Sequence, residues 1–222
     1  MNTKIYTSDA VKKVRLLHRE VINQMTSNTT VKSQLKLISE NLLTEHERAN
    51  SATQIEISNW HPDFVGKDTE TIMNSVFGIA DAKLTIAKGY GFKDWEDVLG
   101  RGEIKFNMKF EHAIDTMLNG NINSLRKQVK RNKDILSERS RYGHRATLLH
   151  YVSSNGVEIR RQKVPLNLAE ITKFLIESGA DKNTKAHFYG GEFTALELAK
   201  TSAHPKDAGI MESLINVLQY SG

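Results

Sequence analysis

The stretch "ATLLHYVSSNG" (Ala146–Gly156) decides the fold. It places a threonine and a histidine among apolar residues and ends at Asn-Gly, a dipeptide that favours a turn. Its start is repeated by "TALE" (Thr194–Glu197), and "EITKFLIESGADKNTK" (Glu170–Lys185) lies between the two. Apolar residues recur there at helical spacing, and Gly, Asn and Asp punctuate the segments. The sequence therefore predicts an internal repeat of helix pairs.

The pattern of this repeat is that of an ankyrin repeat, in which a T-P-L-H-like helix start recurs about every 33 residues. Thr147 and Thr194 are 47 residues apart, so this unit is about 14 residues too long. We assign the excess to an insertion, "VEIRRQKVPLN" (residues 157–167), and to a slightly long hairpin, "KAHFYGGE" (residues 185–192). A degenerate unit precedes it and a final helix pair follows. We expect three irregular ankyrin-type units between Phe110 and Leu218.

The motif residues of these units have an expected scaffold role. They are Thr147, His150, Gly179, Asp181, Asn183 and Thr194. His150 lies at a helix start, where backbone N–H groups lack intrahelical partners and polar side chains bond to them. The alternative is a functional role, because histidine is also a common acid, base and metal ligand.

Residues 1–100 show helical periodicity without the repeat. We expect helices over residues 8–25, 30–49, 68–89 and 92–100, with Val76 and Ile79 facing inward. The segment "FGIADAKLTIAKGYGFKDWEDV" (residues 77–98) resembles a Gly-Phe-x-x-Trp element that precedes ankyrin repeats in an uncharacterised group of bacterial proteins. This resemblance extends over roughly residues 33–218. It implies an all-α fold in which an N-terminal helical module (residues 1–100) caps an ankyrin-repeat domain (residues 101–222), and it implies little about activity.

Composition narrows the function classes. The chain has no cysteine, which excludes disulfides, thiolate metal sites and a cysteine nucleophile. There is no apolar run typical of a signal peptide or a membrane span, so we expect a cytoplasmic protein that does not contact membranes. No Gly-x-Gly-x-x-Gly, P-loop, His-Glu-x-x-His or Gly-x-Ser-x-Gly motif is present. We therefore expect no cofactor and no enzyme activity. His204 and Asp207 are too few ligands for a metal site.

The predicted function is a non-catalytic protein–protein interaction module. Neighbouring ankyrin hairpins lie side by side, and aromatic and arginine side chains are favoured as interface anchors. The candidate partner-binding residues are Tyr142, His144, Arg145, His187 and Tyr189 on the hairpins, with Arg160 and Arg161 in the insertion. The alternatives are ordinary hairpin decoration and a solvated inserted loop.

The sequence is also compatible with other functions. Residues 1–100 carry 12 Lys and Arg against 13 Asp and Glu, whereas residues 101–222 carry 19 against 13. The basic excess, concentrated in Arg126, Lys127, Lys130, Arg131 and Lys133, could contact nucleic acid or form a solvated helix face. An unrecognised enzyme would be built around His144, His150 and Glu158. The chain stops just past the last predicted helix, so a homo-oligomer through that end is a further expectation.

Overall fold

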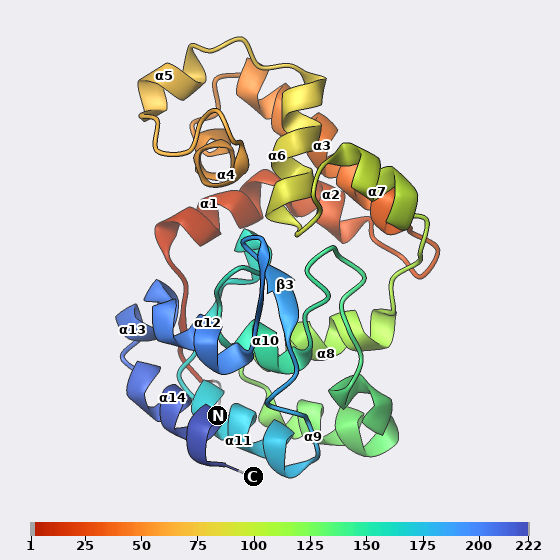
Figure 1. Cartoon of the computed structure of the whole chain (residues 1–222), viewed down its shortest axis with the longest axis vertical. Coiled ribbons are helices and arrows are strands. Elements are labelled where there is room, and N and C mark those ends of the chain that lie inside the picture. Colours follow the sequence, from red (N-terminus) through yellow and green to blue (C-terminus); the bar gives the residue numbers. More distant parts are fainter. Residues whose placement is uncertain (1–2, 222) are drawn as a thin grey trace.

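The computed structural model describes residues 3–221, which are mostly helical (Figure 1). The predicted all-α class is confirmed at this level, although two small two-stranded sheets are also present. The first half contains the helices α1 (Asp9–Leu17), α2 (Arg19–Asn23), α3 (Val31–Glu47), α4 (Thr53–Trp60), α5 (Thr69–Met73), α6 (Ile79–Gly89) and α7 (Trp95–Arg101). The second half contains α8 (Met108–Leu118), α9 (Ile122–Arg131), α10 (Leu148–Val152), α11 (Leu168–Glu177), α12 (Ala195–Thr201), α13 (Ala203–Asp207) and α14 (Met211–Tyr220). Within residues 3–221, no helix is both long and apolar enough to cross a membrane.

The core of the N-terminal half forms around α3 and α6. Thr30 caps α3 through a reciprocal bond with Ser33, which satisfies backbone donors at the helix start. Leu35, Ile38 and Leu42 follow at helical spacing and are fully buried. Figure 1 shows α3 and α6 side by side in the upper half of the molecule, with α4, α5 and α7 around them.

Two predicted helices of this half are broken. The helix expected over residues 8–25 divides at His18 into α1 and α2. The helix expected over residues 68–89 is interrupted between α5 and α6, because Asp68 caps a first short helix and the Asp81 carboxylate caps a second one at Gly78. Val76 lies in the interruption and is 99 % exposed, so its predicted inward position is wrong. Ile79, at the start of α6, is also exposed.

The C-terminal half consists of paired helices. α8 packs against α9, α10 against α11, and α12 against α14, and further contacts join α8 to α10, α10 to α12 and α11 to α14. Their apolar faces form one continuous core from Phe110 to Leu218. Stacking of this kind buries faces that one helix pair would leave in water.

The hairpin and the insertion add short irregular elements to this half. Strands β3 (Ala186–Phe188) and β4 (Gly191–Phe193) pair antiparallel and point toward the N-terminal half (Figure 1). Two 3₁₀ turns, η1 (Lys133–Leu136) and η2 (Ile159–Arg161), lie between helices. Strand β2 (Val164–Pro165) belongs to the insertion, and it pairs antiparallel with β1 (Ile5–Tyr6). Ile5 and Tyr6 are therefore attached to the second half of the chain.

Candidate functional site

The predicted hairpin contact residues do not form one exposed surface. Tyr142 and His144 are 1 % and 0 % exposed, so the prediction that both contact a partner is corrected. The ring of Tyr142 packs edge-on against Tyr90, with centroids 4.7 Å apart, and the ring of His144 stacks on Phe188 at 5.4 Å. Tyr90 of the N-terminal half thus covers Tyr142, whereas the ring of His144 packs among Tyr142, Tyr151 and Phe188 of its own half.

Gly91 permits this close approach of the two halves. Its φ is +79°, and a Cβ at this position would lie 2.4 Å from the backbone nitrogen of His144. The amide of Gly143 donates a hydrogen bond to the Tyr90 carbonyl at 3.0 Å. Only glycine combines the positive φ with the missing side chain. The turn that holds Tyr142 and His144 is thus a docking site within the chain.

His150 has the environment that a scaffold role requires. The side chain is buried, and its Nδ1 accepts hydrogen bonds from the Thr147 amide at 3.1 Å and from the Thr147 hydroxyl at 2.8 Å. Its Nε2 donates to the Phe193 carbonyl at 3.1 Å, which joins α10 to strand β4. Burial lowers the pKa of His150 to about 4, despite the bond to Phe193. A neutral, doubly bonded imidazole positions backbone and has no free nitrogen for proton transfer.

The remaining motif residues lie at helix ends and turns. Gly179 follows α11 with φ +109°, a conformation that ends helices and favours glycine. The Asp181 carboxylate accepts a hydrogen bond from the Asn183 amide at 2.9 Å, which stabilises the turn before the hairpin. Thr194 caps α12 in a reciprocal pair with Glu197. These contacts are local, and each of them stabilises a helix end or a turn.

Tyr189 occupies the first position of a two-residue hairpin loop. Its φ is +52° and that of Gly190 is +80°, as in a type I′ turn, which usually takes Asn-Gly. The ring lies parallel to Trp60 of α4, with centroids 6.0 Å apart, and the hydroxyl donates to the Asn155 side chain at 2.7 Å. Tyr189 is still 61 % exposed. It therefore links the hairpin to the N-terminal half and also presents an edge to solvent.

A group of basic side chains lies beside the same turn, and we call it the basic rim. It consists of Arg139, Arg141, Arg145, Lys185 and His187. The Arg139 guanidinium donates to the carbonyls of Arg145 at 3.0 Å and Lys185 at 2.9 Å, and the His187 amide donates to the His144 carbonyl. The group is thus contiguous in space.

The charges of the basic rim are only partly paired. Arg141 lies 3.2 Å from Glu138, and His187 lies 3.2 Å from Glu192. Within residues 3–221, Arg145 has no ion-pair partner. Partial burial and the charges of Arg141 and Arg139 lower the pKa of Arg145, although Glu138 acts in the opposite direction. An arginine crowded by like charges in this way favours a negatively charged partner.

The insertion holds the N-terminal segment in place. Strand β2 pairs with β1, and Val11 and Val14 of α1 pack with Ile159 of η2 and Ile55 of α4 in a small core of their own. Figure 1 shows α1 crossing between the two halves of the molecule. The predicted boundary at residue 100 therefore does not describe α1, which contacts both sides.

Arg161 lies beneath α1 in a buried network of charges. It is 2 % exposed, so the prediction that it contacts a partner protein is corrected. Its guanidinium donates to Glu111 at 2.7 Å, to Asp115 at 3.2 Å and to Glu158 at 3.3 Å. Tyr151 donates its hydroxyl to Glu158 at 3.2 Å. Several hydrogen bonds are what a buried ion pair needs to offset its desolvation.

Glu158 stays ionised in this network. Burial would raise its pKa, but His144, 3.4 Å away, and the positive charges of Arg161 and Arg160 lower it to about 2. Arg160 is the other arginine of the insertion, and its side chain is 10 % exposed. Unlike Arg161, it lies 4.0 Å from its nearest carboxylate, that of Glu158.

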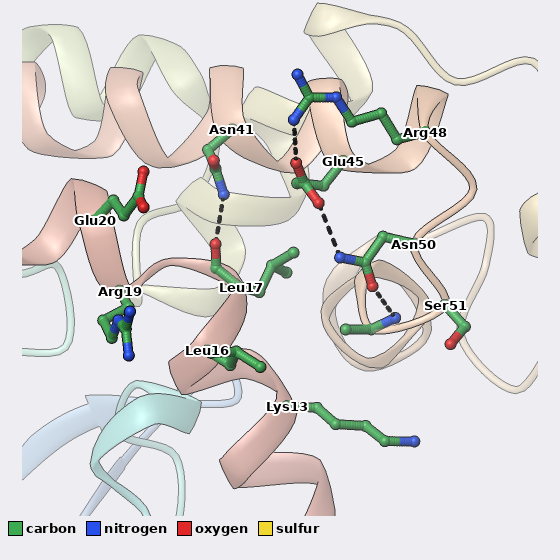
Figure 2. A pocket seen from close by; sticks show the side chains of 11 residues that line it. Lys13, Leu16, Leu17, Arg19, Glu20, Asn41, Glu45, Arg48, Asn50 and Ser51 are labelled. Atoms are coloured by element: carbon green, nitrogen blue, oxygen red, sulfur yellow. Dashed lines mark hydrogen bonds and ion pairs between the residues drawn. The ribbon is translucent and has the colours of Figure 1, made fainter.

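A mixed polar hollow of about 520 Å³ lies between α1–α2 and α3–α4 (Figure 2). Part of its polar lining is engaged within the chain. Glu45 accepts hydrogen bonds from Arg48 and Asn50, each at 2.8 Å, and Asn41 donates to the Leu17 carbonyl at 2.9 Å. These groups are satisfied within the chain, whereas Lys13, Arg19 and Glu20 line the same hollow without a hydrogen bond or ion pair among the described residues.

The remaining predicted features are separate from these sites. Arg126, Lys127, Lys130, Arg131 and Lys133 are all exposed on or just after α9. His204 bonds to Gln162 at 3.0 Å and Asp207 to Tyr6 at 3.1 Å, so they do not act as a pair. In the part of the chain that the structure describes, no group of three or more His, Asp or Glu side chains is placed to hold a metal ion.

Two buried features have no counterpart in the sequence predictions. His18 and Glu56 form a pair with Nε2 and Oε2 2.5 Å apart, and Asn41 bonds to the other ring nitrogen at 3.1 Å. Glu111 pairs with Arg161 across 50 positions of sequence. In both cases the partners are far apart in the chain, and the only local signal is a charged or polar residue at a core position of a helix.

Comparison with known proteins returns no matching family model, no matching curated protein and no matching solved structure.

Proposed function

We propose that this chain is a non-catalytic interaction module that binds an acidic segment of a partner protein through the basic rim. The observation that carries the proposal is Arg145, whose guanidinium lies close enough to Arg141 and Arg139 for their charges to lower its pKa and forms no ion pair with a carboxylate among the described residues. Its backbone φ is +56°, which is uncommon for arginine. A strained residue with an unpaired charge at a surface turn is typical of a binding site.

The framework proposed for this module is a short ankyrin-type stack of three irregular units. Support comes from the paired helices of the second half, from the cap that Thr147 and His150 make, and from the bond between His187 and the preceding turn. The N-terminal helical module covers part of the hairpin face. The uncovered part of that face includes Arg145 and His187, which narrows the proposed contact surface to the basic rim.

The test is affinity capture with the tagged full chain from its native cell, with and without nuclease. A variant with Arg141→Gln and Arg145→Gln removes two rim charges, and Lys127→Gln with Lys130→Gln removes two from α9 as the matched control. Exposed charge pairs contribute about 0.2–1 kcal/mol each, so the loss of two should weaken binding of a partner by about twofold to thirtyfold. A nuclease-resistant partner that both variants retain equally would contradict the proposal.

A second candidate function is binding to nucleic acid through α9. Its basic side chains form no ion pairs with carboxylates among the described residues, and they share an exposed helix face. This mode predicts affinity that falls steeply with salt, by roughly 0.7–0.9 log units per log unit of salt for each phosphate contact. In the capture experiment it would yield nuclease-sensitive material, lost in the α9 variant and kept in the rim variant.

A further inference from the structure

A cleft of about 260 Å³ lies between three segments that are far apart in the sequence: α1–α2, α8 and the insertion. Five of the residues that line it are basic, and one is acidic. The basic residues are Arg15, Arg19, Arg160, Arg161 and Lys163, and the acidic residue is Asp115. The hollow between α1–α2 and α3–α4, by comparison, is lined by three basic and two acidic residues.

Internal carboxylates neutralise only part of this charge. Arg161 is held by Glu111, Glu158 and Asp115, as described above. In the described part of the chain, neither Arg15 nor Arg19 lies within ion-pair distance of a carboxylate. Both side chains are exposed and line the edge of the cleft. Two cations of α1 and α2 thus line the same cleft as three cations of the insertion.

Arg160 gives an independent indication of a missing partner. Its side chain is nine-tenths buried, and its Nε has no hydrogen-bond partner within residues 3–221. A buried charged donor without a partner is costly, and native structures rarely contain one without a ligand, an ion or a water beside it. One Nη nitrogen of Arg161 is also buried without a hydrogen bond, but it lies 3.2 Å from the Asp115 carboxylate in an ion pair, so Arg160 alone carries this indication.

Lys163 is the fifth cation and lies deep in the cleft, 8 % exposed, with its Nζ 2.6 Å from the Asn119 side chain. Burial lowers its pKa to about 8, and the charges of Arg15, Arg161 and Arg160 act in the same direction, whereas Asp115 raises it. An anion in the cleft would offset all of these like-charge contacts at once.

We infer that this cleft binds a small soluble ligand that carries a phosphate or diphosphate group. Guanidinium groups bind phosphate through paired, charge-assisted hydrogen bonds, and lysine adds a point charge. The volume is below the roughly 300–1,000 Å³ of sites for drug-sized molecules, which favours a compact anion. This site differs from the basic rim and does not depend on the function proposed there.

The probe for this site is inorganic pyrophosphate, titrated calorimetrically into the full chain at near-physiological salt, with inorganic phosphate as a second arm. Arg15→Gln with Arg19→Gln removes the two exposed cations of the cleft, where a change should not disturb folding. Lys127→Gln with Lys130→Gln is the control of equal charge on α9. A third variant, Arg160→Gln, removes the buried donor, and its circular dichroism spectrum is compared with that of the unmodified chain.

The expected result is saturable binding at one site, weakened at least about tenfold by the cleft variant and by a folded Arg160→Gln, and changed less than about twofold by the control. Stronger binding of pyrophosphate than of phosphate would assign the diphosphate group, and the reverse would assign the single phosphate. Absence of saturable binding up to about 10 mM of either anion would overturn the inference. Equal weakening by the cleft and control variants would also overturn it, because it would show attraction to net charge alone.

Discussion

Replacing Tyr189 with asparagine separates the preference of a local turn from long-range packing. The position has φ +52° in a two-residue hairpin loop before Gly190, where asparagine is favoured. The local effect alone should stabilise the fold, since a non-glycine residue in the left-handed region costs roughly 1–2 kcal/mol and asparagine avoids part of this cost. A prediction from turn chemistry would therefore be a gain in stability.

The tertiary contacts of Tyr189 predict the opposite sign. Tyr189 is 61 % exposed, so the remaining part of a surface of roughly 200 Å² is covered, which is worth about 2 kcal/mol at ~25 cal/mol per Å². The parallel stack on Trp60 adds roughly 0.5–1.5 kcal/mol, and the hydrogen bond to Asn155 adds about 1 kcal/mol. After the gain in the turn is subtracted, Tyr189→Asn should lower the free energy of unfolding by about 2–3 kcal/mol.

Urea unfolding, followed by tryptophan fluorescence and circular dichroism, measures this difference. Tyr189→Phe is the control that removes only the hydroxyl, and it should cost about 1 kcal/mol. A double-mutant cycle of Tyr189→Asn with Trp60→Leu isolates the stack, with an expected coupling of roughly 0.5–1.5 kcal/mol. If Tyr189→Asn were as stable as the unmodified chain, or more stable, the hairpin would not be held to α4 by this contact.

Two further predictions concern buried polar groups. Arg161→Met leaves Glu111 and Glu158 buried without their main cation, so the free energy of unfolding measured with urea should fall by about 3–5 kcal/mol. A loss below about 1 kcal/mol would show that water solvates the network. For His150, the folded pKa of about 4 lies below the unfolded value of roughly 6.5, so its contribution is complete above pH 6.5 and is lost as the pH falls toward 4. This contribution amounts to roughly 3 kcal/mol, so the free energy of unfolding of His150→Asn should depend less steeply on pH over that interval than that of the unmodified chain. Equal slopes for the two proteins would show that another group titrates there.

Local patterns predicted much of the helical framework. Thr30 with Ser33 and Thr194 with Glu197 cap helices within three residues, so the sequence holds all of the information needed. The helix starting at Thr147 and the hydrogen bonds of His150 follow from the same short spacing. The break before Gly78 was missed because the apolar periodicity continues through Val76, while the caps at Asp68 and Asp81 favour two separate helices.

The candidate site was harder to predict, since its residues are covered by parts of the chain that are distant in sequence. Tyr142 and His144 have the composition of an interface, and they do lie in one, but the other side is the turn at Tyr90 and Gly91. Hairpin periodicity cannot distinguish a partner protein from an N-terminal module that packs onto the same face. The only local indication was Gly91, whose positive φ and close contact suit a backbone that must pass very near another.

The insertion has two roles, and no pattern in the sequence connects them. Its strand β2 and its residue Ile159 hold β1 and α1, and its basic side chains line the cleft below α1. A ligand that contacts Arg15 together with Arg160 would therefore bind more tightly when α1 is docked than when it is released. By thermodynamic linkage, the same ligand must stabilise the docked segment by an equal free energy. Saturation with pyrophosphate at about 100 times its dissociation constant should thus protect the amides of α1 from hydrogen exchange by up to ~2.7 kcal/mol. Binding without such protection would mean that α1 takes no part in the site.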